Sequence, residues 1–401
     1  MKVLELIYNE RKRERGVMET SINIGKNEIS PLITYIENHK DSFTDRPLCA
    51  IDALVLAQIS YLRLDCMVGD FAHDHVPVHS LLKSELFEYL CENTFAPENS
   101  LLLLYAVCAS PRFRDVKMGF HVDIVSKESE EQFSATTFVL PTEECVIGFR
   151  GTDSTMIGWK EDLNMTFLFP IPSQSEALKY VNEVADVVSM PIYITGHSKG
   201  GNLAAYGYSF ASSEIKQRVI SVYNFDGPGF PQDIVQGEQY KQGAEKIIKF
   251  MPEASVIGLF LESTTGVNFI KSTGFSLLSH DLFTWQIDGA QFVKGDKLTR
   301  NMQRADKKIN QWVYELDLEQ RQVFVGAMFS IVYALDVKSS DQLGPALIKN
   351  RKKVLEILHD MDSDTATCVK ESLRCLVGIS SFASRSPKEQ LDKFASMFSQ
   401  E

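Results

Sequence analysis

Residues Ile192–Tyr206 read IYITGHSKGGNLAAY, and this stretch carries the strongest structural signal in the chain. A short run of β-branched and aromatic residues leads into the motif GHSKG at 196–200, and a small-residue segment that favours helix follows. Gly-X-Ser-X-Gly between a strand and a helix is typical of a nucleophile elbow, a sharp turn that exposes the serine Oγ. We therefore predict Ser198 as a nucleophile and the backbone N–H of Lys199 as a donor to an oxyanion. The alternative is a glycine-rich turn in which Ser198 is only a helix N-cap.

The segment at 146–153 reads VIGFRGTD and predicts a strand that ends in a glycine turn. At this turn Thr152 is placed to offer both its N–H and its hydroxyl to a developing oxyanion. Asp162, ten residues further on, is a candidate acceptor for that hydroxyl and would hold its rotamer. Trp159 lies between them in the sequence, and we expect it to shield the site from water.

His280 is the candidate general base. Only one other histidine, His359, follows Ser198, and it lies in a charged segment of helical character. Hydrolases with a nucleophile elbow place their triad along the chain in the order serine, acid, histidine. His280 fits that order because it ends an apolar run downstream of the elbow.

Two carboxylates between Ser198 and His280 follow predicted strands. Glu253 comes after the run at 246–252, and Asp226 comes after the run at 219–225 and before Gly-Pro-Gly. Either carboxylate can accept from an imidazole Nδ1–H and fix its tautomer. We favour Glu253, because the acid more often follows the strand nearest before the histidine. Asp226 also suits a plain turn and Glu253 a solvated loop.

These motifs resemble those of class 3 lipases. The likeness rests on FRGT at 149–152 with Trp159 and Asp162, on GHSKGGNLA at 196–204, and on NFDGPGF at 224–230. Lys199 stands where those lipases more usually have leucine. In this comparison Asp226 falls on a position that is usually glycine, and Glu253 falls near the catalytic aspartate.

The sequence is more similar still to a bacterial family of lipase-like hydrolases of unknown function. That likeness adds SPRF at 110–113, QFSA at 132–135 and the pair His280-Asp281 with Trp285. The resemblance covers roughly residues 45–290 and implies a hydrolase fold and a serine, histidine and acid triad. It implies little about the substrate.

Strand and helix patterns alternate through the middle of the chain. Strands are expected at 120–125 and 133–149, and an amphipathic helix at 173–189. This alternation predicts an α/β protein with the α/β-hydrolase fold, a mostly parallel sheet flanked by helices, and helical additions at both ends. We divide the chain into an N-terminal extension (1–45), a catalytic domain (46–294) and a helical C-terminal region (295–401).

Composition narrows the class of partner. The chain has 401 residues and a net charge of -12, which argues against non-specific binding to nucleic acid. Seven cysteines without a CxxC motif favour reduced thiols and a cytoplasmic location. We expect no signal peptide, because the N-terminus lacks the apolar core of one, and no membrane span, because no apolar run reaches about 20 residues. His73, His75 and His79 lack a fitting partner set, so we predict no metal site.

The run MTFLFPIP at 165–172 directly follows the oxyanion segment. Its large apolar side chains predict a wall of the substrate site that includes Phe167 and Phe169 alongside Trp159. A place in the core fits the pattern equally well. If the run does wall the site, the acyl side of the substrate is apolar, and the substrate is a small or lipid-like ester.

The combined prediction is a serine hydrolase of carboxylic esters that forms an acyl-enzyme and needs no cofactor. A thioesterase or peptidase would use the same chemistry. The alternative from another class is a catalytically silent hydrolase-fold module that binds a partner through its C-terminal helices. The sequence does not indicate an oligomeric state.

Overall fold

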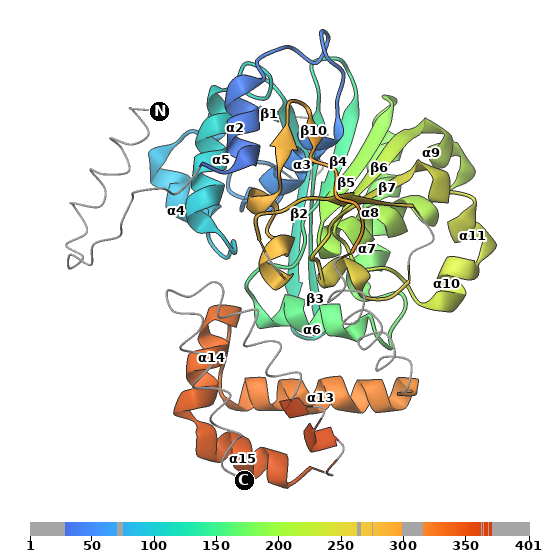
Figure 1. The fold of residues 1–401 in the computed structure, drawn as a ribbon. Helices are drawn as coiled ribbons and strands as arrows, with labels where there is room; N and C mark the ends of the chain where they lie inside the picture. The colour runs from blue at the N-terminus through green and yellow to red at the C-terminus, as the bar shows by residue number, and fades with distance from the viewer. Residues whose placement is uncertain are drawn as a thin grey trace, which may run out of the picture.

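A computed structural model of the chain describes residues 29–69, 75–262, 266–274, 276–298, 316–361, 363, 365–367 and 369–370. Its centre is an eight-stranded sheet, and the order of the strands across the sheet follows the order along the chain (Figure 1). The strands are β1 (Val76–Pro77), β2 (Lys117–Ser126), β3 (Glu131–Val139), β4 (Cys145–Phe149), β5 (Ile192–His197), β6 (Val219–Phe225), β7 (Ile247–Pro252) and β8 (Val267–Ile270). The pairs from β1 to β4 are antiparallel. The pairs from β4 to β8 are parallel, so the carboxyl ends of β4, β5, β6 and β7 lie at one edge. The chain is therefore an α/β protein, as predicted, with the elbow in the parallel part of the sheet.

Helices cover both faces of the sheet (Figure 1). On β5 the side chain of Tyr193 lies in one core with α2 (Pro31–Asn38), α3 (Ala50–Ile59) and α5 (Pro97–Ala109). Ile192 and Ile194 lie in a second core with α7 (Pro172–Val187) and α8 (Lys199–Ser209). Successive side chains of a strand point to opposite faces, so a continuous apolar run such as β5 is buried on both sides. The sheet is thus packed between two helical layers, which hold the ends of its strands in place.

Shorter elements surround this frame. They are α4 (Phe87–Leu90), α9 (Ser213–Arg218), α10 (Gln232–Gln236), α11 (Glu238–Lys241), β9 (Ile287–Asp288), β10 (Gln291–Phe292) and the 3-10 turns η1 (Val78–Leu81), η2 (Ser84–Leu86), η3 (Ala244–Lys246), η4 (Ile257–Leu259), η5 (Ser276–His280) and η6 (Leu282–Thr284). Two of them, β9 and β10, pair as a separate two-stranded antiparallel sheet.

Residues 29–45, predicted to belong to an extension, are part of the main core instead. Leu32 and Ile36 of α2 are buried. Their apolar side chains belong to the main hydrophobic cluster, and a buried ion pair lies beside them: Arg112 donates from Nε and Nη2 to the two carboxylate oxygens of Asp52, at 2.8 and 2.6 Å. The same guanidinium donates to the carbonyl oxygens of Asp41 and Ser42. This satisfied pair gives the SPRF motif a structural role, because it ties the start of the described chain to α3.

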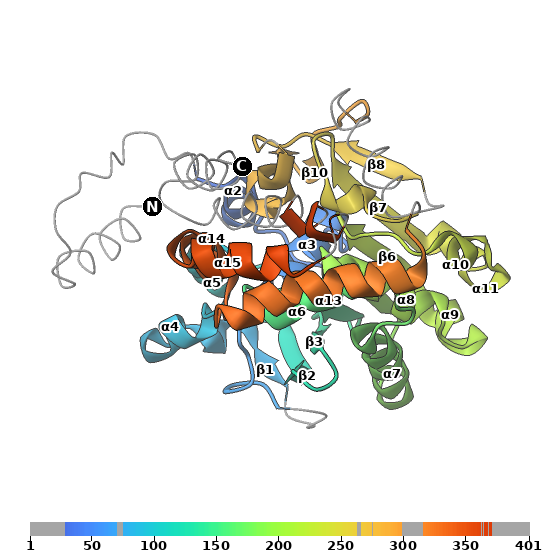
Figure 2. The ribbon, with the colours of Figure 1, turned by 90° about the horizontal axis from the view of Figure 1, so that it is seen from below.

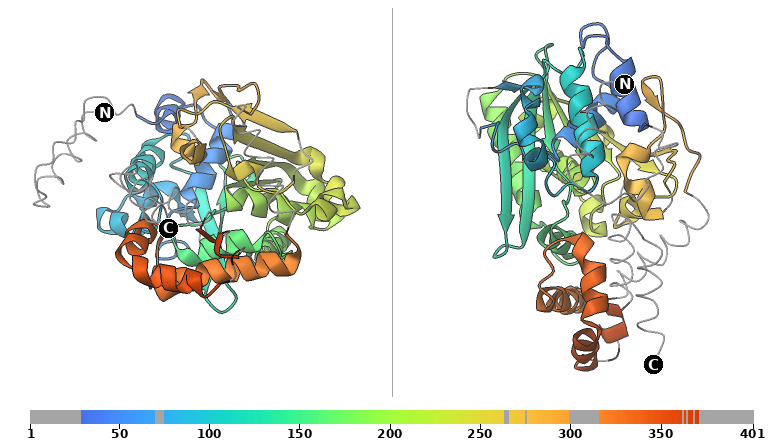
Figure 3. Two further views of the ribbon diagram at one scale, coloured as in Figure 1. Left: turned by 60° about the horizontal axis from the view of Figure 1, so that its bottom comes forward. Right: turned by 90° about the vertical axis from the view of Figure 1, so that its left-hand side faces the viewer.

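Three helices of the C-terminal region pack beneath α6 (Met156–Asn164), beyond one end of the sheet (Figures 2 and 3). They are α13 (Leu318–Ala334), α14 (Ser340–Lys349) and α15 (Arg351–His359). Met156 of α6 is buried in their apolar cluster, and its N–H donates to the carbonyl of Lys338. Two of the seven cysteines, Cys368 and Cys375, lie outside the described residues. No helix in the described ranges is long and apolar enough to cross a membrane.

Candidate active site

The turn between β5 and α8 has the geometry of a nucleophile elbow. Ser198 adopts φ 58° and ψ -132°, a conformation that non-glycine residues rarely hold. Both glycines of the motif are required sterically. A Cβ on Gly196 would collide with the Gly200 carbonyl, and a Cβ on Gly200 would collide with the Phe149 carbonyl of β4. Strain of this kind costs roughly 1–3 kcal/mol and persists only where the surroundings enforce it.

His280 pairs with Asp226. The imidazole Nδ1 donates to Asp226 Oδ2 at 2.7 Å, and the Ser255 hydroxyl donates to the same oxygen at 2.7 Å. Asp226 is fully buried directly after β6, the strand next to β5. Since the carboxyl ends of adjacent parallel strands meet at one edge, the carboxylate and Ser198 come from neighbouring strand ends. Ser198 N–H donates to the carbonyl of Phe225, the residue before Asp226.

Glu253 does not take this place, so the preference for it over Asp226 is corrected. Its carboxylate accepts from the N–H of Asp296 at 2.6 Å and lies against Gly295. The physical reason is the order of strands. Glu253 follows β7, which is one strand further from β5 than β6 is, and a Cβ-free Gly258 leaves room for the Asp226 carboxylate.

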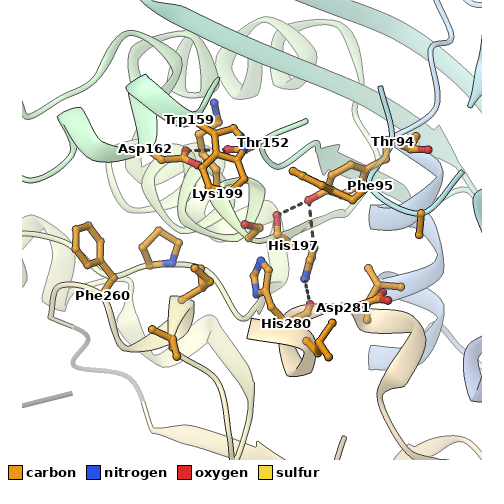
Figure 4. A pocket seen from close by; sticks show the side chains of 18 of the residues that line it. Thr94, Phe95, Thr152, Trp159, Asp162, His197, Lys199, Phe260, His280 and Asp281 are labelled. Atoms are coloured by element: carbon orange, nitrogen blue, oxygen red, sulfur yellow. Dashed lines mark hydrogen bonds between the residues drawn. The ribbon is translucent and has the colours of Figure 1, made fainter. Parts of the chain in front are cut away.

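Thr152 and Asp162 meet on the opposite side of the site (Figure 4). The Thr152 hydroxyl lies 2.8 and 2.6 Å from the two carboxylate oxygens of Asp162, as the spacing predicted. Burial raises the pKa of Asp162 to about 6, against the opposing effects of Lys199 and the Thr152 hydroxyl. While Asp162 is ionised the hydroxyl proton points to it, so the Thr152 N–H is the donor left for an oxyanion.

The side chain of Lys199 makes a buried ion pair that the motif alone did not reveal. Its Nζ donates to Glu161 Oε2 at 2.7 Å and to the carbonyl of Gln132 at 2.7 Å. The same Glu161 oxygen accepts from the Gln132 N–H, and the other accepts from the Ser173 N–H. The pair therefore joins α8, α6, β3 and α7 behind the oxyanion side. The Lys199 N–H, in the first turn of α8, has no acceptor within the helix.

Ser198, His280, Thr152 and Lys199 line one cavity of about 340 Å³. Most of its other lining side chains are apolar: Phe95, Trp159, Leu163, Met165, Val256, Ile257, Phe260, Leu278, Leu282 and Phe283. Deep apolar walls with a few polar groups at one place are typical of a small-molecule site. Trp159 lies where it was expected.

Phe167 and Phe169, predicted to wall the site, lie elsewhere. Phe169 packs against Tyr206, Phe210 and Phe230, with ring centroids 5.6, 6.0 and 6.2 Å away. Phe167 packs against the C-terminal cluster. From this run Met165 reaches the cavity. The run forms the connection between the end of α6 at Asn164 and the start of α7 at Pro172. Its side chains therefore pack against different parts of the molecule.

No group of three or more His, Cys, Asp or Glu side chains in the described part of the chain is arranged to hold an ion. His73 lies outside the described residues, and His79 Nδ1 contacts the carbonyl of Arg114 at 3.0 Å.

Sequence comparison places the chain in a family. The profile of the Mbeg1-like family matches residues 107–330, more than half of the chain. This chain belongs to the Mbeg1-like family. The matched range of this Mbeg1-like chain runs from α5 to α13, so it includes Ser198, Asp226 and His280. A search of curated proteins finds no match.

Solved structures similar to this Mbeg1-like chain include two lipases. The native Rhizomucor miehei lipase propeptide complex is 14% identical with a TM-score of 0.35, over 60% of this chain and 80% of that chain. M37 lipase is 15% identical with a TM-score of 0.33, over 65% of this chain and 79% of its own. Likenesses at this level carry no argument about function, which therefore depends on the site itself.

Proposed function

We propose that this Mbeg1-like protein is a serine hydrolase of the α/β-hydrolase fold that cleaves carboxylic esters. The observation that carries the proposal is the Asp226–His280 hydrogen bond at 2.7 Å, beside a serine held at positive φ in the same cavity. A buried carboxylate that fixes a histidine next to a strained serine suits nucleophilic catalysis. The apolar lining supports an ester with an apolar, lipid-like acyl group.

The proposed reaction has two stages. Ser198 Oγ attacks the ester carbonyl carbon while His280 Nε2 removes the hydroxyl proton, and Asp226 stabilises the imidazolium. The carbonyl oxygen becomes an oxyanion that the N–H groups of Lys199 and Thr152 stabilise. The carbon–oxygen bond then breaks, the alcohol leaves with the proton from His280, and water hydrolyses the acyl-enzyme by the same steps.

A fluorophosphonate probe tests this proposal directly, because it labels serines that an adjacent base activates. We expect labelling of the full-length protein, loss of labelling in Ser198→Ala, and full labelling in Ser209→Ala. Ser209 is a buried serine at the end of the same helix and serves as the matched control. An unlabelled, folded wild-type protein would favour the silent binding module instead.

A panel of p-nitrophenyl esters, thioesters and peptides then distinguishes the ester hydrolase from a thioesterase or peptidase. We expect turnover of esters to exceed that of thioesters and peptides.

The proposed location is the cytoplasm, and the free thiols of Cys49, Cys66, Cys91, Cys108 and Cys145 support it.

A further inference from the structure

His197, the residue directly before Ser198 in the motif, contacts the main chain of the candidate base. Its Nε2 lies 2.9 Å from the carbonyl oxygen of His280. The two imidazole rings stack with centroids 4.5 Å apart and an interplanar angle of 29°. His197 is buried, whereas the His280 side chain is 20% exposed. A side chain from the elbow itself thus contacts the main chain of the candidate base (Figure 4).

The hydrogen bonds define which nitrogen of His197 carries the proton. A carbonyl oxygen can only accept, so Nε2 is the donor to His280. Burial lowers the pKa of His197 well below its usual value, and the neighbouring His280 lowers it further, so the ring is neutral. Its Nδ1 is then an acceptor, and the Tyr61 hydroxyl lies 3.1 Å from it. Tyr61, just after α3, can donate to this Nδ1, and the same hydroxyl also lies 3.3 Å from the His197 carbonyl oxygen, so its position supports the tautomer that contacts His280.

The segment that carries His280 has little regular structure to hold it. His280 ends the short turn η5, and two successive carbonyls at this end are bound by ring N–H groups. Trp285 Nε1 donates to the carbonyl of Ser279 at 2.8 Å, and His197 Nε2 donates to that of His280. The side chains of Trp285 and His197 therefore help to hold the main chain at His280 in position at the edge of the sheet. A neutral ring does this without adding positive charge beside the imidazolium that forms during the reaction.

We propose that His197 is a positioning residue whose Nε2–H, oriented by Tyr61, holds the His280 main chain so that its imidazole faces both Asp226 and Ser198. The inference rests on the proposed function, since it assigns a role within the same site. It predicts a loss in kcat rather than in KM, because His197 sets the geometry of the base. A displacement of about 1 Å in a reacting group can cost on the order of 100-fold in rate.

The test compares two replacements at 197. His197→Gln keeps an N–H donor near the position of Nε2, and His197→Leu removes it. We expect His197→Leu to lower kcat on p-nitrophenyl acetate, and the fluorophosphonate labelling rate, by roughly 10- to 100-fold with KM nearly unchanged. His197→Gln should recover most of this loss, and Tyr61→Phe should fall between the two.

His121→Leu is the matched control. His121 is also buried on the sheet, and burial lowers its pKa to about 4, but its partner is the Thr136 hydroxyl on β3. We expect its loss to be in stability, with the labelling rate per folded molecule unchanged. A folded His197→Leu variant that labels as fast as wild type would overturn the inference and leave the proposed function intact.

A second readout does not depend on turnover. The Nδ1–H of His280, shared with Asp226, should give a slowly exchanging low-field proton resonance in wild type and His197→Gln, and a rapidly exchanging one in His197→Leu. If wild-type protein fails to label, the proposed function fails. The inference then stands if the resonance follows this pattern and falls if His197→Leu retains it.

Discussion

The two sides of the cavity are held in different ways. On the side proposed for the acid and base, the His280 ring is partly exposed on a short turn, and it is held by Asp226 and, through its main chain, by His197. On the oxyanion side, Thr152, Asp162, Lys199 and Glu161 form a buried network between strands and helices. In the proposed mechanism the more exposed side exchanges protons and the buried side stabilises a developing charge, which groups do best when they are fixed in advance.

The largest expected effect concerns the acid. Asp226→Asn should lower kcat by roughly 10³- to 10⁴-fold, because the amide favours the wrong tautomer of the histidine. Glu253→Gln, the matched control at the end of the next strand, should stay within about twofold of wild type. Steady-state kinetics on p-nitrophenyl acetate measures both, and the opposite ranking would return the acid to Glu253.

Substitutions in the buried network on the oxyanion side should mainly lower the free energy of unfolding. Lys199→Leu leaves Glu161 buried without its cation and should lower the free energy of unfolding by roughly 3–5 kcal/mol, measured by urea denaturation. Lys199→Leu combined with Glu161→Gln should recover most of the loss. The control is Lys179→Leu, which breaks the exposed pair with Glu176 and should cost about 1 kcal/mol or less. Equal losses at 199 and 179 would contradict a role for burial.

Asp162 makes this side sensitive to pH. Its pKa is raised by burial, from about 4 in the unfolded chain to about 6 in the fold, so the stability that it contributes is present below pH 4 and lost as the pH rises through 6. Asp162→Asn does not titrate. The free energy of unfolding of this variant, relative to wild type, should therefore rise by roughly 1–3 kcal/mol between about pH 4 and pH 8. A difference that stays constant with pH would show that the carboxyl is not perturbed.

The smallest expected effect separates the cavity wall from the core. Met165→Phe narrows the cavity and should raise KM for long-chain p-nitrophenyl esters roughly 3- to 10-fold more than for the acetate. Phe169→Leu lies in the aromatic core and should lower stability while leaving the ratio of the two KM values unchanged. A chain-length effect at Phe169 and none at Met165 would reverse this assignment.

Local motifs predicted the parts of the site that depend on adjacent residues. The elbow at Ser198 and the contact between Thr152 and Asp162 needed only short spacings, and the structure has both. Identifying the acid required the positions of whole strands in the sheet. Two carboxylates each follow a strand, and only the order of the strands across the sheet shows that Asp226 is the one that reaches His280.

Other partners were hidden because they come from distant segments. Tyr61 meets His197 across 136 residues, and Glu161 meets Lys199 across 38. The apolar run around Phe169 carried no periodicity that distinguishes core from cavity. A lysine in a motif that more usually has leucine was the one available signal for Glu161, since a buried cation requires a partner.

Helix α6 has a consequence for how distant parts of the chain affect one another. Trp159 and Leu163 line the cavity and also contact the apolar cluster of α13 to α15. A ligand that moves these two side chains on binding would therefore also change the packing of α13 to α15. By thermodynamic reciprocity, a change in that packing would then alter the affinity of the cavity by the same factor. Helix α6 is the element that places the cavity wall and the C-terminal helices in contact.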